Sequence, residues 1–154
     1  MNGEAMIGAA FFGKLAMVNQ WKPYAESEKD IIELRRLCCI DDTPKNTESF
    51  FIGKMLRWLK KNTEFKVVLS YADQEHGHQG TIYKASNFKY MGISKGADVI
   101  DFDGKVYHDK AQRSKYNGEL KPYAQRLNEA VLSGEAKKRK TAGKHIYIYE
   151  LTSR

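Results

Sequence analysis

One short stretch of the chain holds several side chains that can perform acid–base chemistry. In SYADQEHGHQGTIYKASNF, Ser70 and Asp73 precede two histidines, His76 and His78, and a tyrosine, Tyr83. A carboxylate or imidazole can orient a substrate amine or take its proton. A phenol, with an ordinary pKa of about 10, can donate a proton to a basic group. The stretch therefore indicates proton transfer beside a bound substrate.

A predicted buried strand positions the first of these residues. Residues 65–72, FKVVLSYA, are rich in β-branched and aromatic types and nearly continuous in apolar character. Ser70 and Asp73 would lie at and just beyond its carboxyl end, where ligands of open α/β sheets bind. Asp73 would bind a substrate amine or hold a base, although an aspartate also commonly starts a turn. For Tyr83, the alternative is a half-buried aromatic that fills the core.

The two histidines raise the question of a metal site. His76 and His78 flank Gly77, and with Asp73 they contain metal-ligand types. No Cys-x-x-Cys or helical His-x-x-x-His accompanies them, and His108 lies far along the chain. We therefore expect no metal, and we assign His76 and His78 to substrate contacts or to capping of the following helix.

Hydrophobic periodicity and turn residues predict the other elements. In chain order they are two short strands within 5–18, a strand over 30–40, a helix over 47–61, the strand over 65–72, a helix from 81 to Gly92, a hairpin at Asp103-Gly104, a helix over 120–134, a solvated basic loop over 135–144 and a final strand over 145–151. Strict alternation in 30–40 places Leu34 and Leu37 on opposite faces. In the helix over 47–61 the apolar stripe comprises Phe51, Met55, Trp58 and Leu59.

Composition bounds the class of protein. The chain has 154 residues, of which 42% are hydrophobic, and this predicts a single globular domain over 1–154. Its formal charge of +7 favours nucleic acid or another anionic partner. Cys38 and Cys39 are adjacent, which disfavours a bridge between them and points to a reducing, cytoplasmic location. No apolar run reaches the roughly 20 residues of a membrane span, so we expect no membrane association.

Basic side chains cluster in the second half of the chain. The run KKRK, Lys137 to Lys140, together with Arg113, would neutralise phosphates, and three tyrosines would stack on bases: Tyr107, Tyr116 and Tyr123. The alternative is an ordinary solvated charge cluster. The sequence alone leaves both open.

The order of these elements resembles that of the GNAT acyltransferases, and IYKASNFKYMGIS is similar to the GNAT segment that carries a tyrosine, here Tyr83. A closer resemblance is to the phage Mom family, GNAT-like proteins that modify adenine in DNA. The stretches that carry it are IGAAFFGK, LRRLCCIDDTPKNTESFFIGKMLR, SYADQEHGHQGTIYKASNF, DGKVYHDKAQRSKYNG and KHIYIYEL. They cover most of the chain in the same order as in the family.

The resemblance implies an α/β (α+β) fold of GNAT-like architecture, with a mixed, mostly antiparallel central sheet, helices on both faces and a shortened N-terminal part. It implies transfer of an acyl-derived group, from acetyl-CoA or a related acyl-CoA, to the exocyclic amine of adenine in DNA. Tyr83 would act as the acid, with Ser70 and Asp73 beside it. Substrate would contact His76, His78, Arg113, Lys138 and Arg139. The protein would act in the host cytoplasm.

Cofactor binding is expected at the start of the helix over 47–61. The residues are Lys45, Asn46, Thr47 and Ser49, with Asn87 as a further contact. GNAT proteins usually have a glycine-containing turn here, whose amides hold a pyrophosphate. The equivalent TPKNTES contains no glycine. Binding would therefore depend on the amides and the dipole of the helix start.

Two other functions remain open from the sequence. One is a protein N-acetyltransferase that modifies a host factor, and the other is a catalytically inactive nucleic-acid-binding module. Glu33 is a candidate base acting through water, but an ion pair with Arg35 on the same strand face is favoured. A homodimer would supply the layer that the shortened N-terminal part lacks.

Overall fold

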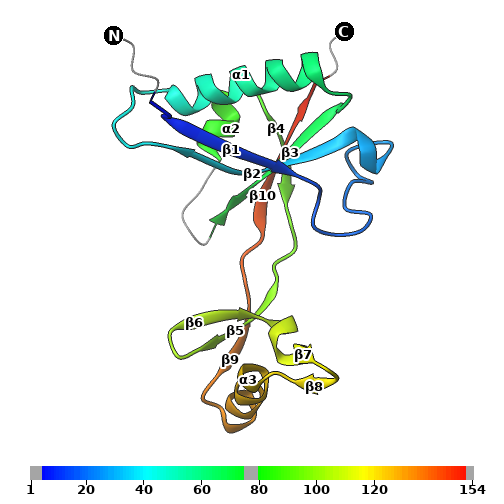
Figure 1. Cartoon of the computed structure of the whole chain (residues 1–154), viewed down its shortest axis with the longest axis vertical. Coiled ribbons are helices and arrows are strands. Elements are labelled where there is room, and N and C mark those ends of the chain that lie inside the picture. Colours follow the sequence, from blue (N-terminus) through cyan, green and yellow to red (C-terminus); the bar gives the residue numbers. More distant parts are fainter. Residues whose placement is uncertain (1–4, 75–79, 152–154) are drawn as a thin grey trace. The chain divides into compact units, whose positions relative to one another are not determined.

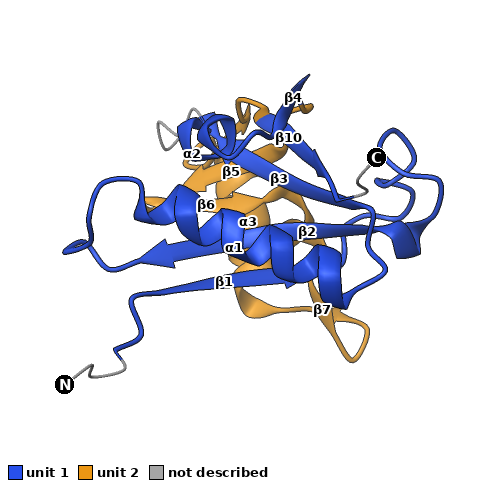
Figure 2. Cartoon of the chain, turned by 90° about the horizontal axis from the view of Figure 1, so that it is seen from above, with its two compact units in different colours: residues 1–93, 145–154 blue, residues 94–144 orange. Residues whose placement is uncertain are grey.

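The computed structural model of the chain describes residues 5–74 and 80–151. His76 and His78 therefore lie outside the described residues. The chain forms two compact units, one of residues 1–93 with 145–154 and one of residues 94–144, which Figure 2 colours separately. Each unit is described by itself below, and the single domain over 1–154 stays a prediction.

The first unit is built on a five-stranded mixed sheet of order β1-β2-β3-β10-β4 (Figure 1). The strands are β1 (Gly8–Gly13), β2 (Ile31–Cys39), β3 (Val67–Asp73), β10 (Lys144–Glu150) and β4 (Lys89–Ile93). The pairs β1–β2 and β10–β4 are antiparallel, whereas β2–β3 is parallel. The predicted mixed sheet is confirmed, as are the strands predicted over 30–40, 65–72 and 145–151. The N-terminal segment forms one strand, β1, instead of the two expected.

One face of this sheet packs against both helices of the unit. They are α1 (Thr47–Asn62) and α2 (Thr81–Ala85). Ile52 and Leu56 of α1 form a buried core with Leu34 of β2 and Val68 of β3, and Tyr83 of α2 packs against the same core. The connection β2–α1–β3 joins parallel strands by a crossover, which places α1 on one face.

The opposite face is covered without an α-helix. Val67, Leu69 and Ile148 form a second core with Trp21 and Tyr24 from the connection between β1 and β2. That connection ends in a single 3-10 turn, η1 (Glu28–Asp30). The expectation of helices on both faces is therefore wrong for this sheet, because a 17-residue connection of turns and bends takes the place of a helical layer.

A bulge interrupts the alternation of β2. Phe11 of β1 pairs with Arg36, but the next residue, Phe12, pairs with Leu34, so Arg35 is extra. An extra residue shifts the strand by one position. As a result Leu37 packs against the same core as Leu34. The predicted strict alternation is wrong beyond Leu34.

The predictions for the two helices of this unit are confirmed in part. α1 begins and ends within one residue of the predicted range, but Trp58 is 61% exposed and the buried stripe is formed by Ile52, Leu56 and Leu59. α2 ends at Ala85 instead of continuing to Gly92. Asn87 follows in a left-handed conformation with φ 64°, which stops the helix before β4.

The second unit is a small α+β assembly. Its three-stranded antiparallel sheet has the order β6-β5-β9, with β5 (Asp98–Phe102), β6 (Lys105–His108) and β9 (Lys137–Lys140). The hairpin predicted at Asp103-Gly104 is confirmed, and both residues have positive φ, 50° and 69°. The basic loop predicted over 135–144 is partly wrong, because β9 pairs with β5 although its side chains are exposed.

A helix covers one face of this smaller sheet. α3 (Pro122–Ser133) was predicted, and it packs Leu127 and Ala130 against Ile100 of β5. The 3-10 turn η3 (Asp109–Arg113) and a two-stranded hairpin of β7 (Lys115–Tyr116) and β8 (Glu119–Leu120) complete the unit. Among the described residues, no helix of either unit is long and apolar enough to cross a membrane.

Candidate active site

Two parallel strands of the first unit separate near the middle of β2. Pairing joins Ile31–Leu34 of β2 to Val67–Ser70 of β3 and ends there, although β2 continues to Cys39 and β3 to Asp73. The second half of β2 stays paired with β1, and the bulge at Arg35 lies where the separation begins. The sheet therefore opens between β2 and β3 on the carboxyl side of Leu34 and Ser70.

Ser70 and Tyr83 meet beside this opening. The Ser70 side chain is fully buried, and its hydroxyl donates to the Leu34 carbonyl oxygen at 3.2 Å, so it bridges the last residue pair of β2 and β3. The same hydroxyl lies close enough to the Tyr83 phenol to lower the pKa of that phenol. The Tyr83 ring lies 5.4 Å, centroid to centroid, from both Phe88 and Tyr147. Packing on these rings fixes the direction of the phenol.

The start of α1 lies near the same phenol. Burial raises the pKa of the Tyr83 phenol, the neighbouring Ser70 hydroxyl lowers it, and the Glu48 carboxylate in the first turn of α1 raises it. Burial and the same carboxylate also raise the pKa of Cys39 at the end of β2. The end of β2, the start of α1 and Tyr83 of α2 are therefore close enough to interact electrostatically. Sequence spacing gave no signal for Glu48, because its proximity arises only from the fold.

A protonated phenol results from this environment. Since its pKa is raised above the ordinary value of 10.0, Tyr83 carries its proton throughout the neutral range. A protonated phenol that is partly buried beside the Ser70 hydroxyl can donate a proton to an anion that forms next to it. This arrangement suits a general acid and does not suit a base.

The predicted cofactor loop offers backbone amides more than side chains. Asn46 precedes α1 in a left-handed conformation and makes no side-chain cap. The Thr47 hydroxyl donates to the Pro44 carbonyl oxygen at 2.6 Å, and the Ser49 hydroxyl donates to the Asn46 carbonyl oxygen at 3.0 Å. These two hydroxyls are thus used within the loop, whereas Lys45 is exposed. The Thr47 amide also donates to the Pro44 carbonyl oxygen, at 3.2 Å, so the Glu48 and Ser49 amides and Lys45 are the groups of this loop that can bind an anion.

An apolar cavity of about 180 Å³ adjoins this loop. Its lining includes Cys39, Thr47, Phe50 and Phe51. The start of α1 therefore combines amide donors with an apolar surface. Asn87 lies elsewhere, past the end of α2, and its left-handed backbone explains the residue type without a ligand.

Two predicted carboxylates lie away from Tyr83. Alternation along β3 places Asp73 on the face of Leu69 and Tyr71, opposite to that of Ser70. Its role in the chemistry stays a prediction. Glu33 lies 3.8 Å, Oε2 to Nε, from Arg35, which is the favoured ion pair.

Burial of phenols in the first unit predicts a loss of stability at high pH. Burial raises the pKa of Tyr71, Tyr83 and Tyr147, so the folded chain holds these protons after the unfolded chain has released them. The contribution is present below about pH 10 and lost as the pH rises through the folded pKa values. We expect the free energy of unfolding in urea to fall above pH 10. The fall should be smaller in Tyr83→Phe, and an identical pH dependence in both proteins would contradict the assignment.

The predicted DNA-contacting residues come together within the second unit. Arg113, Lys138 and Arg139 line one cavity of about 570 Å³, together with Asp98 and Asp109. Arg113 lies 3.3 Å from Asp109, Nη2 to Oδ2, and Arg139 pairs with Asp101. Both arginines thus have partners within the chain, and Lys138 is exposed. Of the predicted stacking residues, Tyr107 packs in the core, whereas Tyr116 and Tyr123 are 72% and 46% exposed.

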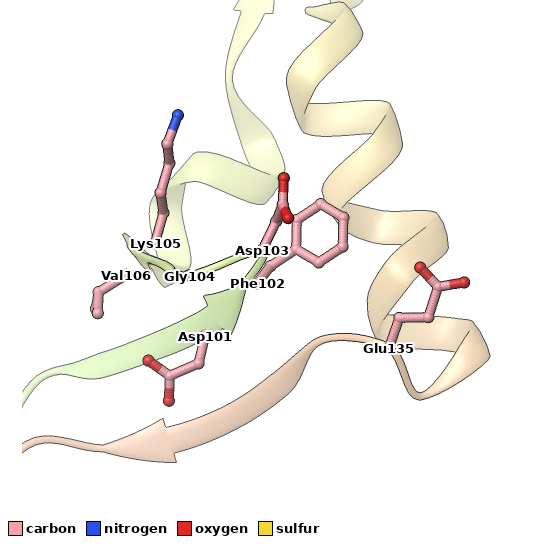
Figure 3. Close-up of a pocket in the computed structure, with 7 residues that line it drawn as sticks. All are labelled: Asp101, Phe102, Asp103, Gly104, Lys105, Val106 and Glu135. Atoms are coloured by element: carbon pink, nitrogen blue, oxygen red, sulfur yellow. The ribbon is translucent and has the colours of Figure 1, made fainter.

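A second cavity of the same unit has the opposite character. It lies at the β5–β6 hairpin, has a volume of about 350 Å³ and is lined by Asp101, Asp103 and Glu135, with Lys105 as its one cation (Figure 3). Figure 3 shows Glu135 coming from the segment that follows α3 and the others from the hairpin. Asp101 is paired with Arg139, so Asp103 and Glu135 are the carboxylates that make this lining acidic, and it is less suited to phosphate than the cavity beside Arg113 and Lys138.

Comparison with known proteins confirms the family resemblance. The model of the Mom protein family matches residues 1–154. The methylcarbamoylase Mom of Escherichia phage Mu is 34% identical over 113 residues, which cover 70% of this chain and 46% of the relative. The aligned part thus spans about half the length of that relative.

Proposed function

The chain belongs to the Mom protein family, whose model matches residues 1–154, and from this premise we propose that it transfers an acyl-derived group to the exocyclic amine of adenine in DNA. The relative's name, methylcarbamoylase, specifies transfer of a methylcarbamoyl group by that protein. The observation that carries the proposal for this chain is the partly buried Tyr83 phenol, which lies beside Ser70 where β2 and β3 separate.

A GNAT-like architecture is part of the proposal. The resemblance implies a central pair of strands that separates, a helix that starts close to the opening and a tyrosine on the next helix. Three features of this chain support the proposal: β2 and β3 separate, α1 starts near the opening, and α2 carries Tyr83. The chemistry of that class then applies to named residues of this chain.

The donor would be acetyl-CoA or a related acyl-CoA. The first-turn amides of α1 and Lys45 fit the anionic part, and the apolar cavity lined by Cys39, Phe50 and Phe51 fits an apolar arm. The hydroxyls of Thr47 and Ser49 do not fit as ligands, since they already donate to loop carbonyls. A bound thioester supplies an activated carbonyl carbon and a thiolate leaving group.

Protons balance through residues of the chain. A new N–C bond forms at the adenine amine while the C–S bond breaks, the amine loses one proton and the thiolate gains one. The proton that the amine loses passes to water, Tyr83 donates its proton to the thiolate, and the phenolate then recovers one from water, as the raised pKa of Tyr83 favours. Ser70 lies beside the phenol, whereas Asp73 lies on the opposite face of β3 and is given no part in this step. An amine inside a duplex is out of reach, so the base must be flipped or single-stranded.

The charge distribution favours DNA as the acceptor over protein. Residues 94–144 contain twelve Lys or Arg and seven Asp or Glu, a formal charge of +5 out of +7 for the chain. The lysines of β9 are exposed, and the strand that carries them belongs to the sheet of this unit, because it is paired with β5. A concentrated positive charge on one unit suits a polyanion.

Salt dependence of DNA binding tests this assignment. Replacing the three β9 lysines, Lys137, Lys138 and Lys140, with alanine is expected to weaken binding and to reduce the slope of log affinity against log salt by about 2 to 3. The matched control replaces three exposed cations of α1, Arg57, Lys60 and Lys61. Fluorescence anisotropy with a labelled oligonucleotide measures both. Equal slopes in the two triple variants would contradict a specific role for β9.

The reaction itself is tested with purified protein, DNA and isotope-labelled acyl-CoA. The proposal predicts label on adenine after digestion to nucleosides. Label found only in added host protein would instead support the protein N-acetyltransferase. DNA binding without any transfer would support the inactive module, which the engaged hydroxyls of Thr47 and Ser49 favour.

A further inference from the structure

An aromatic pocket of the first unit has no part in the chemistry described so far. It is lined by Lys84 of α2, Tyr90 of β4, and His145 and Tyr147 of β10, and its volume is about 300 Å³. Three of its four lining side chains are aromatic. A volume at the lower end of the range for small-molecule sites suits one heterocyclic ring system.

The pairing of β4 with β10 builds this pocket. Tyr147 pairs directly with Tyr90, and one residue of β4, Met91, is extra between Tyr90 and Gly92. Directly opposed residues project to the same face of a sheet, so the two rings meet there. Their centroids lie 5.4 Å apart, and those of Tyr90 and His145 lie 5.6 Å apart. The Tyr90 hydroxyl and His145 Nδ1 are 3.0 Å apart, which fixes both side chains.

Burial differs across the pocket in the way that a binding site requires. Tyr147 is 1% exposed and forms a fixed wall, whereas Tyr90 is 47% exposed and can be reached from solvent. Lys84 is exposed and adds one cation to the lining. The Tyr147 ring also contacts the Tyr83 ring at 5.4 Å, so one aromatic side chain separates the pocket from the candidate active site.

We propose that this pocket binds a nucleobase unstacked from the DNA substrate, an inference that rests on the proposed function. Exposed aromatic faces bind bases by stacking, at about 1 to 3 kcal/mol per base, and Lys84 would meet the adjoining phosphate. An enzyme that modifies a base must remove it from the stack, and aromatic surfaces near the reactive group stabilise the unstacked state. Tyr90 and His145 then act as base-positioning residues.

The test compares two oligonucleotides of equal charge, one with bases and one that is abasic at every position, bound without any donor. Tyr90→Ala should bind the base-containing strand about tenfold more weakly than the unmodified protein. The two proteins should bind the abasic strand equally, because the pocket then has no ligand. Tyr90→Phe, which keeps the ring, should bind like the unmodified protein.

Phe11→Ala removes an exposed aromatic side chain from β1, the other edge of the same sheet, and serves as the matched control. It should not change the preference for the base-containing strand. Tyr90→Ala binding both strands as the unmodified protein does, or weakening both equally, would overturn the inference.

The result is separate from the proposed function. A base-dependent loss of affinity in Tyr90→Ala supports the pocket even if no group transfer is found. Group transfer to adenine combined with unchanged binding by Tyr90→Ala overturns the pocket and leaves the proposed function in place.

Discussion

Replacing Tyr83 with phenylalanine is expected to lower the rate of group transfer by about 10²- to 10⁴-fold, the usual contribution of a positioned general acid. The raised pKa of the phenol keeps it protonated at neutral pH, and contacts with the Phe88 and Tyr147 rings hold it beside the opening. Single-turnover kinetics with DNA and the donor measures the rate. DNA affinity should stay the same, because the ring remains in place.

The substitution should leave the fold intact. Ser70 keeps its own acceptor, the Leu34 carbonyl oxygen, so no buried donor loses its partner. Tyr149→Phe is the matched control, since this phenol lies in β10 and packs on Phe88 from another position. An equal loss of rate in the two variants would show that the Tyr83 hydroxyl has no special role.

The second large effect is expected at Gly80, directly before α2. Gly80 is buried with φ 71°, and a Cβ built there would lie 2.3 Å from Cε2 and 2.5 Å from Cζ of Tyr147. Tyr147 is almost fully buried and cannot move aside. Gly80→Ala combines a left-handed conformation with overpacking, and we expect it to reduce the free energy of unfolding by about 3 kcal/mol.

Variants of two other glycines distinguish the backbone cost from the overpacking cost when the free energy of unfolding is measured in urea. Gly134 also has positive φ but faces open space, so Gly134→Ala carries only the backbone cost of about 1 kcal/mol. Gly53 lies inside α1 with no atom near its added Cβ, and Gly53→Ala should stabilise by about 0.5 to 1 kcal/mol. If Gly80→Ala proves as stable as Gly134→Ala, the close packing of Tyr147 on Gly80 is incorrect.

Loss of group transfer should accompany the loss of stability in Gly80→Ala. Tyr147 packs directly on the Tyr83 ring, and Gly80 accepts the first backbone hydrogen bonds of α2, from the Tyr83 and Lys84 amides. A displaced helix start therefore moves the phenol away from Ser70.

Local sequence patterns were sufficient to predict single helices and strands. The predictions that the structure corrects are those that depend on contacts between elements. The strand over 31–39 and helix α1 follow from local periodicity. The bulge at Arg35 does not, because it depends on pairing with β1 and on the separation from β3. Without it, Leu37 would project away from the core that it helps to form.

The end of α2 and the strand conformation of β9 also could not be predicted from the local sequence. An apolar pattern continues past Ala85, but the left-handed Asn87 and the pairing of Tyr90 with Tyr147 make the next segment a strand. The run KKRK has the composition of a solvated loop, yet its backbone completes a sheet while its side chains stay in solvent. Side-chain polarity therefore does not predict backbone pairing of this kind.

The candidate site was predicted in part. Tyr83 and Ser70 were named from the sequence, and they lie close enough for the Ser70 hydroxyl to lower the pKa of the phenol. Glu48, Tyr147 and the pocket around Tyr90 were not, because ring contacts and the proximity of a helix start depend on how three separate segments pack. Tyr90 and His145 are 55 positions apart, and a pair so distant in the sequence has no recognisable spacing.

The most direct measurement is mass spectrometry of nucleosides from DNA of cells that express the chain, with Tyr83→Phe and Tyr149→Phe in parallel. Transfer to the exocyclic amine predicts a heavier adenosine with the unmodified protein and with Tyr149→Phe, and its near absence with Tyr83→Phe. The same amount of modified adenosine in all three samples, or none in any while each protein is folded and expressed, would contradict the role given to the phenol at the parting strands.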